Sequence, residues 1–167
     1  MEKEISNKRK FSSFLALIVS IAICEFAGIV GSFFTFSEIP TWYATITKPA
    51  INPPSWVFGP VWTTLFFLMG ISAFLVWRKM ETNREDVKMA LSIFGFQLIL
   101  NTLWSIIFFG MHNIGLALAE IVVLWLAIVW TIVEFYKLSR ASAYLLLPYI
   151  VWVTFAGYLT YNLWVLN

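Results

Sequence analysis

Residues 89–136 read MALSIFGFQLILNTLWSIIFFGMHNIGLALAEIVVLWLAIVWTIVEFY, two long apolar runs separated by the short stretch MHN at residues 111–113. Each run has the length of about 20 residues that an α-helix needs to cross the hydrocarbon core of a bilayer. The break between the runs has room only for a tight turn. The stretch therefore predicts an antiparallel hairpin of two membrane-spanning helices, at residues 89–110 and 114–136.

Three further apolar stretches have a similar length, and charged or turn-forming segments separate them. They cover residues 11–36, 55–77 and 142–165, with approximate ends. The composition agrees, because 60% of the 167 residues are hydrophobic and 12% are charged, whereas soluble domains are about half apolar and a quarter charged. We predict an all-α membrane protein, a bundle of five transmembrane helices that forms a single domain over residues 1–167.

The basic residues sort sharply between the two sides of the predicted bundle. Ten Lys and Arg residues fall on the N-terminal side and only Lys48 on the other. The positive-inside rule then places a short basic tail, residues 1–10, in the cytoplasm, and the loop 37–54 and the C-terminus outside a bacterial or archaeal cell membrane. The apolar stretch after the tail is too long for a signal peptide, and we expect it to be retained. The net charge of +2 gives no indication of a nucleic-acid partner.

Several polar residues lie inside the predicted spans, where such residues are costly and often functional. In the third span, Gln97, Asn101 and Ser105 share one helical face, and Trp104 and Phe108 join it. Two hypotheses remain open for this face. It could supply hydrogen bonds between helices, or it could form a stripe that faces a ligand.

Two carboxylates, Glu25 and Glu120, lie deep in the spans, and no Lys or Arg lies deep enough to pair with either. We expect both to be protonated or heavily hydrogen-bonded, because an unpaired buried charge is very costly. A stripe of small residues in the first span is expected to serve helix packing. It includes Cys24, Gly28 and Ser32. No metal site is expected, because the single histidine, His112, lies in a turn.

Polar residues, tryptophans and one alanine of four predicted helices lie at a similar depth in the membrane, if each helical residue contributes a rise of about 1.5 Å. They are Trp62, Asn101, Glu120 and Ala156, with Trp152 somewhat deeper, near the middle of the bilayer. The first four lie in the half of the bilayer nearest the loop 37–54. This layer predicts a pocket that opens toward that loop.

The segment KPAINPPSWVFGPVW, residues 48–62, is rich in proline and tryptophan. Its prolines stiffen the approach to the second span, and Ser55 is expected to be the N-cap of that helix. One hypothesis is a rigid lid above an apolar pocket. Its residues would be Trp42, Tyr43, Pro49, Pro53 and Trp56. The other hypothesis is an aromatic belt at the membrane interface, where Trp and Tyr gather in general.

Four segments, taken in chain order, carry a family resemblance. They are WYATITKPAINPPSWVFGPVW at 42–62, QLILNTLWSIIFFG at 97–110, ALAEI at 117–121 and LPYIVWVTFA at 147–156. They resemble the translocator protein family (TspO/MBR), the tryptophan-rich sensory proteins, once called peripheral benzodiazepine receptors. The resemblance implies five helices around one pocket that the loop after the first helix closes, often in a homodimer.

The resemblance also implies the ligands and the residues that line the pocket. The ligands would be porphyrins, above all protoporphyrin IX, and other flat apolar molecules such as isoquinoline carboxamide drugs, with sterols in some members. The family's pocket residues fall here on Tyr43, Trp62, Asn101, Trp152 and Ala156. To these we add Trp104, Phe108 and Phe155 as ligand-binding candidates.

The chain departs from the family pattern near its end. Thr160 and Val165 stand where the family commonly has Asn and Arg. The proposed cholesterol motif needs a Lys or Arg after its Tyr, and none follows Tyr158 or Tyr161. We therefore do not expect high-affinity sterol binding through that motif.

Four functions are compatible with these features. The first is a membrane receptor or carrier for porphyrins or other apolar small molecules, with the porphyrin as ligand and no cofactor required. The second is an enzyme that degrades protoporphyrin in light, with Trp62 and Trp152 as redox-active neighbours of the ring. The third is a regulator that contacts partner proteins, with ligand occupancy as the signal. The fourth, an ion or proton channel, depends only on Glu25 and Glu120. A lipid or sterol carrier is a further alternative to the first.

Overall fold

The computed structural model describes residues 2–167, with side chains described from Ser12 onwards. Over these residues the chain is almost entirely helical and has no strand, so the predicted all-α class is confirmed. Five helical segments are long and apolar enough to cross a membrane. They are Ser12–Glu38, Ser55–Trp77, Arg84–Gly110, Ile114–Leu138 and Arg140–Leu166.

These spans are assembled from helices of several kinds. In chain order the elements are α1 (Glu2–Glu38), α2 (Trp42–Thr45), the 3₁₀ helix η1 (Ser55–Val57), α3 (Phe58–Trp77), α4 (Arg84–Ser105), the π-helix η2 (Ile106–Gly110), α5 (Ile114–Leu138), α6 (Arg140–Leu145) and α7 (Leu147–Leu166). The helix of the first span continues back into the predicted tail, residues 1–10, because α1 begins at Glu2, whereas the apolar span itself begins at Ser12. The basic side chains of that tail lie outside the described residues.

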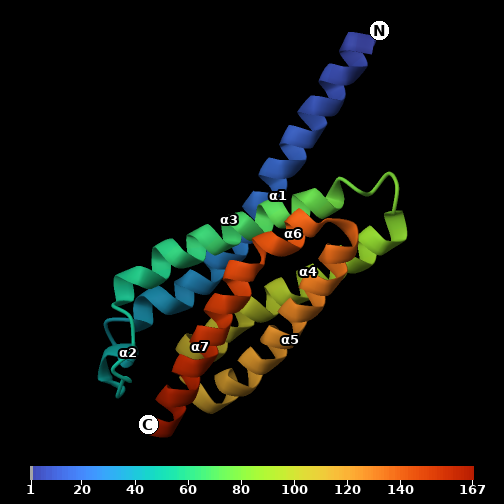
Figure 1. The fold of residues 1–167 in the computed structure, drawn as a ribbon. Coiled ribbons are helices and arrows are strands. Elements are labelled where there is room, and N and C mark those ends of the chain that lie inside the picture. The colour runs from blue at the N-terminus through green and yellow to red at the C-terminus, as the bar shows by residue number, and fades with distance from the viewer. Residues whose placement is uncertain (1) are drawn as a thin grey trace.

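The helices form an elongated bundle in which α1 and α3 run together along one edge and α4 and α5 along the other (Figure 1). The predicted hairpin is present, because α4 packs against α5 and the two are joined at residues 111–113. His112 has a φ of 52° in this turn, and the side chain of Asn113 accepts a hydrogen bond from the Leu116 N–H at 2.9 Å. We call the end of the bundle that holds this turn, α2 and Asn167 the loop end.

The last predicted span, residues 142–165, is not one continuous helix. It divides at Leu146 into α6 and α7, because Pro148 in the first turn of α7 has no N–H to donate to the preceding turn. The short α6 packs against α3 at the end of the bundle away from the loop end. There the buried Ser72 and Ser142 hydroxyls each donate to the other residue's carbonyl oxygen, at 2.9 and 2.7 Å.

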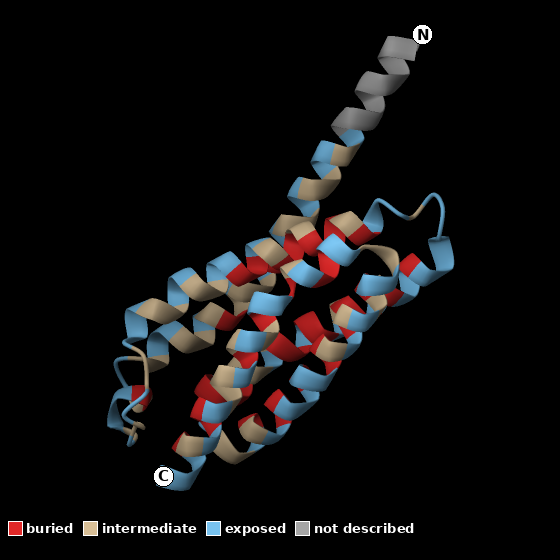
Figure 2. Cartoon of the chain, in the orientation of Figure 1, coloured by how far each residue is buried: buried red, intermediate tan, exposed pale blue. Residues whose placement is uncertain are grey.

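The core of the bundle lies where the helices face one another, whereas the outer faces are exposed (Figure 2). Its largest fully buried side chains include Met69, Phe108, Phe135 and Tyr149. The exposed outer faces are themselves apolar, with many large side chains such as Phe33, Ile99 and Val151. Apolar surface on all sides of a helical bundle is what a bilayer requires, and it agrees with the five spans.

Candidate functional site

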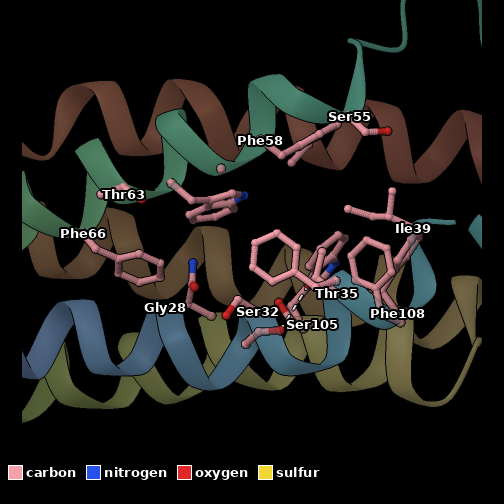
Figure 3. Close-up of a pocket in the computed structure, with 18 of the residues that line it drawn as sticks. Gly28, Ser32, Thr35, Ile39, Ser55, Phe58, Thr63, Phe66, Ser105 and Phe108 are labelled. Carbon is pink, nitrogen blue, oxygen red and sulfur yellow. Dashed lines mark hydrogen bonds between the residues drawn. The ribbon is translucent and has the colours of Figure 1, made fainter.

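A cavity of about 320 Å³ lies in the half of the bundle nearest the loop end. Its walls come from α1, α3, α4 with η2, and α7, and Tyr43 of α2 contributes at the loop end. Figure 3 shows the side chains of α3 on one side of this space and those of α1 on the other. The volume lies near the lower end of the range for ligand pockets, about 300 to 1,000 Å³.

All of the predicted ligand-binding residues except Phe155 line this cavity. They are Tyr43, Trp62, Asn101, Trp104, Phe108, Trp152 and Ala156. Phe155 instead lies beside Trp152, with 5.6 Å between the ring centroids. Of the layer predicted from depth, Glu120 also stays outside the cavity lining, whereas Glu25 of α1 belongs to it.

The predicted lid residues other than Tyr43 do not line the cavity. These are Trp42, Pro49, Pro53 and Trp56. Trp56 is 75% exposed, as expected for an aromatic belt at the interface. The expected N-cap at Ser55 is also wrong, because Pro54 precedes η1 in that position and no side-chain cap is made. Ser55 itself lines the cavity.

The cavity walls are formed largely by flat aromatic rings. Trp104 stacks on Phe108, with centroids 4.9 Å apart and an interplanar angle of 14°. On the opposite side, Phe58 of α3 meets Trp152 of α7 edge-on at 6.1 Å, and Trp62 lies nearby on α3. Aromatic rings bury much apolar area and prefer offset or edge-to-face contacts. Such walls are suited to a flat, apolar, polycyclic ligand.

A short chain of buried polar groups joins α4 to α7 next to the cavity. The Asn101 side-chain N–H donates to the Tyr149 hydroxyl at 2.9 Å, and that hydroxyl donates to the Gln97 carbonyl oxygen at 2.9 Å. Gln97 thus makes the interhelical hydrogen bonds of the first hypothesis. Asn101 does so and also lines the cavity, as does Ser105. Gln97 therefore fits the hypothesis of hydrogen bonds between helices, and Ser105 faces the cavity as a ligand-facing stripe would. Asn101 does both.

Several buried polar atoms have no hydrogen-bond partner among the residues that the structure describes. They are the indole Nε1 atoms of Trp104 and Trp152, the side-chain nitrogen of Gln97 and both carboxyl oxygens of Glu120. Most buried polar groups are paired, so each exception requires an explanation. For Trp104 and Trp152, which line the cavity, an indole N–H can only donate. Either could donate to an acceptor on a bound ligand.

Sequence reasoning missed the contribution of α1 to the cavity. The small residues of this helix were expected to serve packing alone, but several of them line the cavity. They are Gly28, Gly31, Ser32 and Thr35. Their spacing of three and four residues places them on one helical face, which is the signal that could have identified them.

The π-helix η2 was also not predicted. It follows α4 directly and contributes Phe108 and Phe109 to the cavity wall, both of them buried. A π-helical turn is wider than an α-helical turn and often occurs at functional sites. The wider turn lets two consecutive phenylalanines face the interior.

The loop after α1 is held down by contacts with distant parts of the chain. The Tyr43 hydroxyl donates to the Asn52 side-chain oxygen at 2.8 Å. Burial raises the pKa of the Tyr43 phenol above its usual range, and the hydrogen bond to Asn52 opposes this shift. Asn167 makes two hydrogen bonds with the Thr47 backbone, accepting from its N–H at 2.9 Å and donating to its carbonyl at 3.0 Å.

Trp42 fastens the same loop to the turn between α4 and α5. Its ring stacks on the His112 imidazole, with 4.4 Å between centroids and an interplanar angle of 13°. The His112 Nε2 atom lies 3.0 Å from a Glu38 carboxyl oxygen. Trp42 therefore holds the loop against the α4–α5 turn from outside the cavity. Tyr43, which is buried, lines the cavity.

Comparison with known proteins gives a consistent result. The sequence pattern of the TspO/MBR family matches residues 20–165. The chain is 44% identical over 153 residues to the tryptophan-rich protein TspO of Archaeoglobus fulgidus, covering 92% of this chain and 97% of that protein. It is 40% identical over 135 residues to the human translocator protein, with 81% and 80% covered. It is 39% identical over 126 residues to the tryptophan-rich sensory protein of Cereibacter sphaeroides, with 75% and 77% covered.

Proposed function

Because this chain belongs to the TspO/MBR family and is an integral, multi-pass membrane protein, we propose that it is a membrane receptor or carrier for porphyrins and related flat apolar molecules. The ligand occupies the cavity near the loop end. The names of its relatives agree with a role in transport or sensing, since they include a translocator protein and a sensory protein.

The observation that carries this proposal is the shape of the cavity walls. Trp62, Trp104 and Trp152 come from three different spans, and all three line the same space. Flat rings on several sides favour a flat ligand, because offset stacking and edge contacts add to the area that is buried. A pocket that is mostly apolar with few polar groups is typical of small-molecule sites.

The polar groups of the cavity suggest how the ligand is oriented. Protoporphyrin IX carries propionate carboxylates, which accept hydrogen bonds, and the indole N–H groups of Trp104 and Trp152 have no acceptor among the described residues. Asn101 lines the cavity as well, and its amide has a second N–H besides the one given to Tyr149. These donors would be the polar anchors of an otherwise apolar site.

The test is a titration of the purified protein with protoporphyrin IX, with and without the substitution Ala156→Leu. Ala156 lines the cavity one turn beyond Trp152, so that a larger side chain occupies space that the ligand needs. We expect the affinity to fall at least tenfold, about 1.4 kcal/mol. The matched control is Ala119→Leu, the same change at an exposed position on α5. Equal affinity of the folded Ala156→Leu variant and the control would show that the ligand does not bind in this cavity.

A second candidate function is light-dependent degradation of the bound porphyrin. It is favoured by the position of Trp62 and Trp152, two oxidisable side chains in the wall of one cavity. Loss of porphyrin absorbance under illumination, measured for the protein and its Trp→Phe variants, separates this activity from binding alone.

A further inference from the structure

The contact between α1 and α3 changes from tight to open along the two helices. A Cβ atom on Gly70 of α3 would lie 2.5 Å from the Cα of Ile21 on α1, so the two backbones touch there. Nearer the loop end, the atoms nearest to a Cβ on Gly28 would belong to the Phe66 ring of α3, at 2.5 Å, so that a side chain and not backbone makes the contact. Near the start of α3, a Cβ on Gly59 would meet nothing within 4 Å. Along these helices, backbone therefore meets backbone at Gly70, backbone meets a side chain at Gly28, and the space beside Gly59 is open.

In the same region α1 packs on the other side of the cavity. A Cβ on Gly31 would lie 3.1 Å from the Ser105 hydroxyl oxygen of α4. A Cβ on Gly110, at the end of η2, would lie 3.0 Å from the ring of Phe34. Because α1 packs closely on α4 and η2 here, the gap is left on its α3 side.

Two other boundaries of the cavity are covered by aromatic side chains. Phe58 and Trp152 meet between α3 and α7, and the buried Tyr43 lies at the loop end. By contrast, the α1 residues Ile29 and Phe36 line the cavity and are 51% and 68% exposed on the outer surface of the bundle. Side chains that belong to both the cavity and the lipid-facing surface mark an opening between the two.

We propose that the cavity opens sideways, between α1 and α3, into the hydrocarbon of the bilayer, and that its ligand enters and leaves through this lateral portal. We define the portal by Ile29 and Phe36 of α1 and Gly59 and Thr63 of α3. The inference deepens the proposed function and rests on it for the identity of the ligand. It restricts that ligand to molecules that first dissolve in the membrane.

The alternative route, through the loop end, requires several contacts to break. The Tyr43–Asn52 hydrogen bond, the paired hydrogen bonds of Asn167 with Thr47, and the stack of Trp42 on His112 all hold the loop in place. The lateral route requires none of these contacts to break. Along that route the ligand passes the side chains of Ile29 and Phe36 and displaces lipid chains, which are mobile and apolar.

The test compares the kinetics of porphyrin binding in three proteins reconstituted into phosphatidylcholine vesicles preloaded with protoporphyrin IX. Gly59→Trp places a large side chain in the portal without a backbone clash, because nothing lies near its Cβ. Gly95→Trp is the matched control, since its Cβ is equally free and Gly95 does not line the cavity. We expect Gly59→Trp to slow both association and dissociation at least tenfold, because a blocked entrance slows passage in either direction. Gly95→Trp should behave as the unmodified protein.

A third variant tests the alternative route directly. Asn167→Ala removes the two hydrogen bonds to Thr47 and so loosens the loop. Entry through the loop end predicts faster association in this variant and an unchanged rate in Gly59→Trp, and that pair of results would overturn the portal. Lateral entry predicts an unchanged rate for Asn167→Ala.

A measurement without ligand separates the portal from the proposed function. A nitroxide label at Ser32→Cys, in a Cys24→Ala background, reports from the cavity wall. An open portal predicts frequent collisions with oxygen, which concentrates in lipid, and few with a water-soluble nickel complex. The reverse preference would refute the portal. Oxygen preference without any porphyrin binding would instead reject the proposed ligand and leave the portal standing.

Discussion

The substitution Gly70→Ala should destabilise the bundle, although alanine is the better helix former. Gly70 lies in the interior of α3 at its closest approach to α1. The added methyl group would lie 2.5 Å from the Cα and 3.0 Å from the backbone nitrogen of Ile21. Backbone atoms cannot rotate away as a side chain can, so the two helices must move apart.

Three contributions set the magnitude of this effect. Overpacking costs about 1 to 3 kcal/mol. Separation of the helices also weakens the hydrogen bond from the Ser20 hydroxyl to the Gly70 carbonyl oxygen, now 2.8 Å long, at a cost of about 1 kcal/mol. The change from Gly to Ala in a helix interior returns about 1 kcal/mol. The hydrogen bond and the propensity roughly cancel, which leaves a net loss of about 1 to 3 kcal/mol from the clash.

The free energy of unfolding, measured in mixed micelles with increasing sodium dodecyl sulfate, tests this expectation. Gly95→Ala serves as the control, because Gly95 is also inside a helix but its Cβ would meet nothing within 4 Å. At Gly95 the higher helix propensity of alanine is the only contribution, and we expect the free energy of unfolding to rise by up to about 1 kcal/mol. The two Gly→Ala changes should thus have opposite signs. Equal stability changes at the two positions would refute the backbone contact between α1 and α3 as the reason.

Three further predictions follow from the topology, the aromatic walls and the loop. A tag at the C-terminus should react with a membrane-impermeant reagent on intact cells, because the basic residues are concentrated on the N-terminal side; labelling of an N-terminal tag instead would invert the topology. Trp62→Phe and Trp152→Phe should each weaken protoporphyrin binding by less than about 1.5 kcal/mol, the upper end of an aromatic pair's contribution. Each should nevertheless abolish any light-dependent bleaching of the porphyrin. Identical bleaching in the unmodified protein and both variants would exclude a redox role for both residues. Tyr43→Phe removes the hydrogen bond to Asn52, worth about 1 kcal/mol, and should speed amide hydrogen exchange in residues 42–54, whereas unchanged exchange would show that this bond does not hold the loop.

The membrane-spanning elements could be predicted from the sequence because hydropathy and length are local properties. The apolar runs on either side of the MHN turn require two helices of full membrane length, and the short break requires them to be antiparallel. Part of the cavity wall could be predicted for a similar reason. Trp62, Asn101 and Ala156 lie at one depth because a helix has a constant rise, so their positions along the chain already place them in one layer.

Side-chain direction within that layer could not be predicted in the same way. Phe155 lies between two cavity residues, Trp152 and Ala156, in sequence and in depth, but it does not line the cavity. Glu120 shares the depth but stays outside the lining as well. In η2 the wider π-helical turn changes which side chains point inward, and a pattern that assumes α-helical spacing does not detect it.

The sequence by itself determined that this protein is a helical membrane bundle with aromatic side chains gathered in one half of it, because composition, apolar length and constant rise are properties of single segments. Only the tertiary structure decided that the small residues of α1 line a cavity, and that α1 and α3 touch at Gly70 whereas the space beside Gly59 is open. The physical reason is that the distance between two helices depends on pairs of residues far apart in the chain. Ile21 and Gly70 bring α1 and α3 together at one level, and Gly31 and Ser105 bring α1 close to α4 at another.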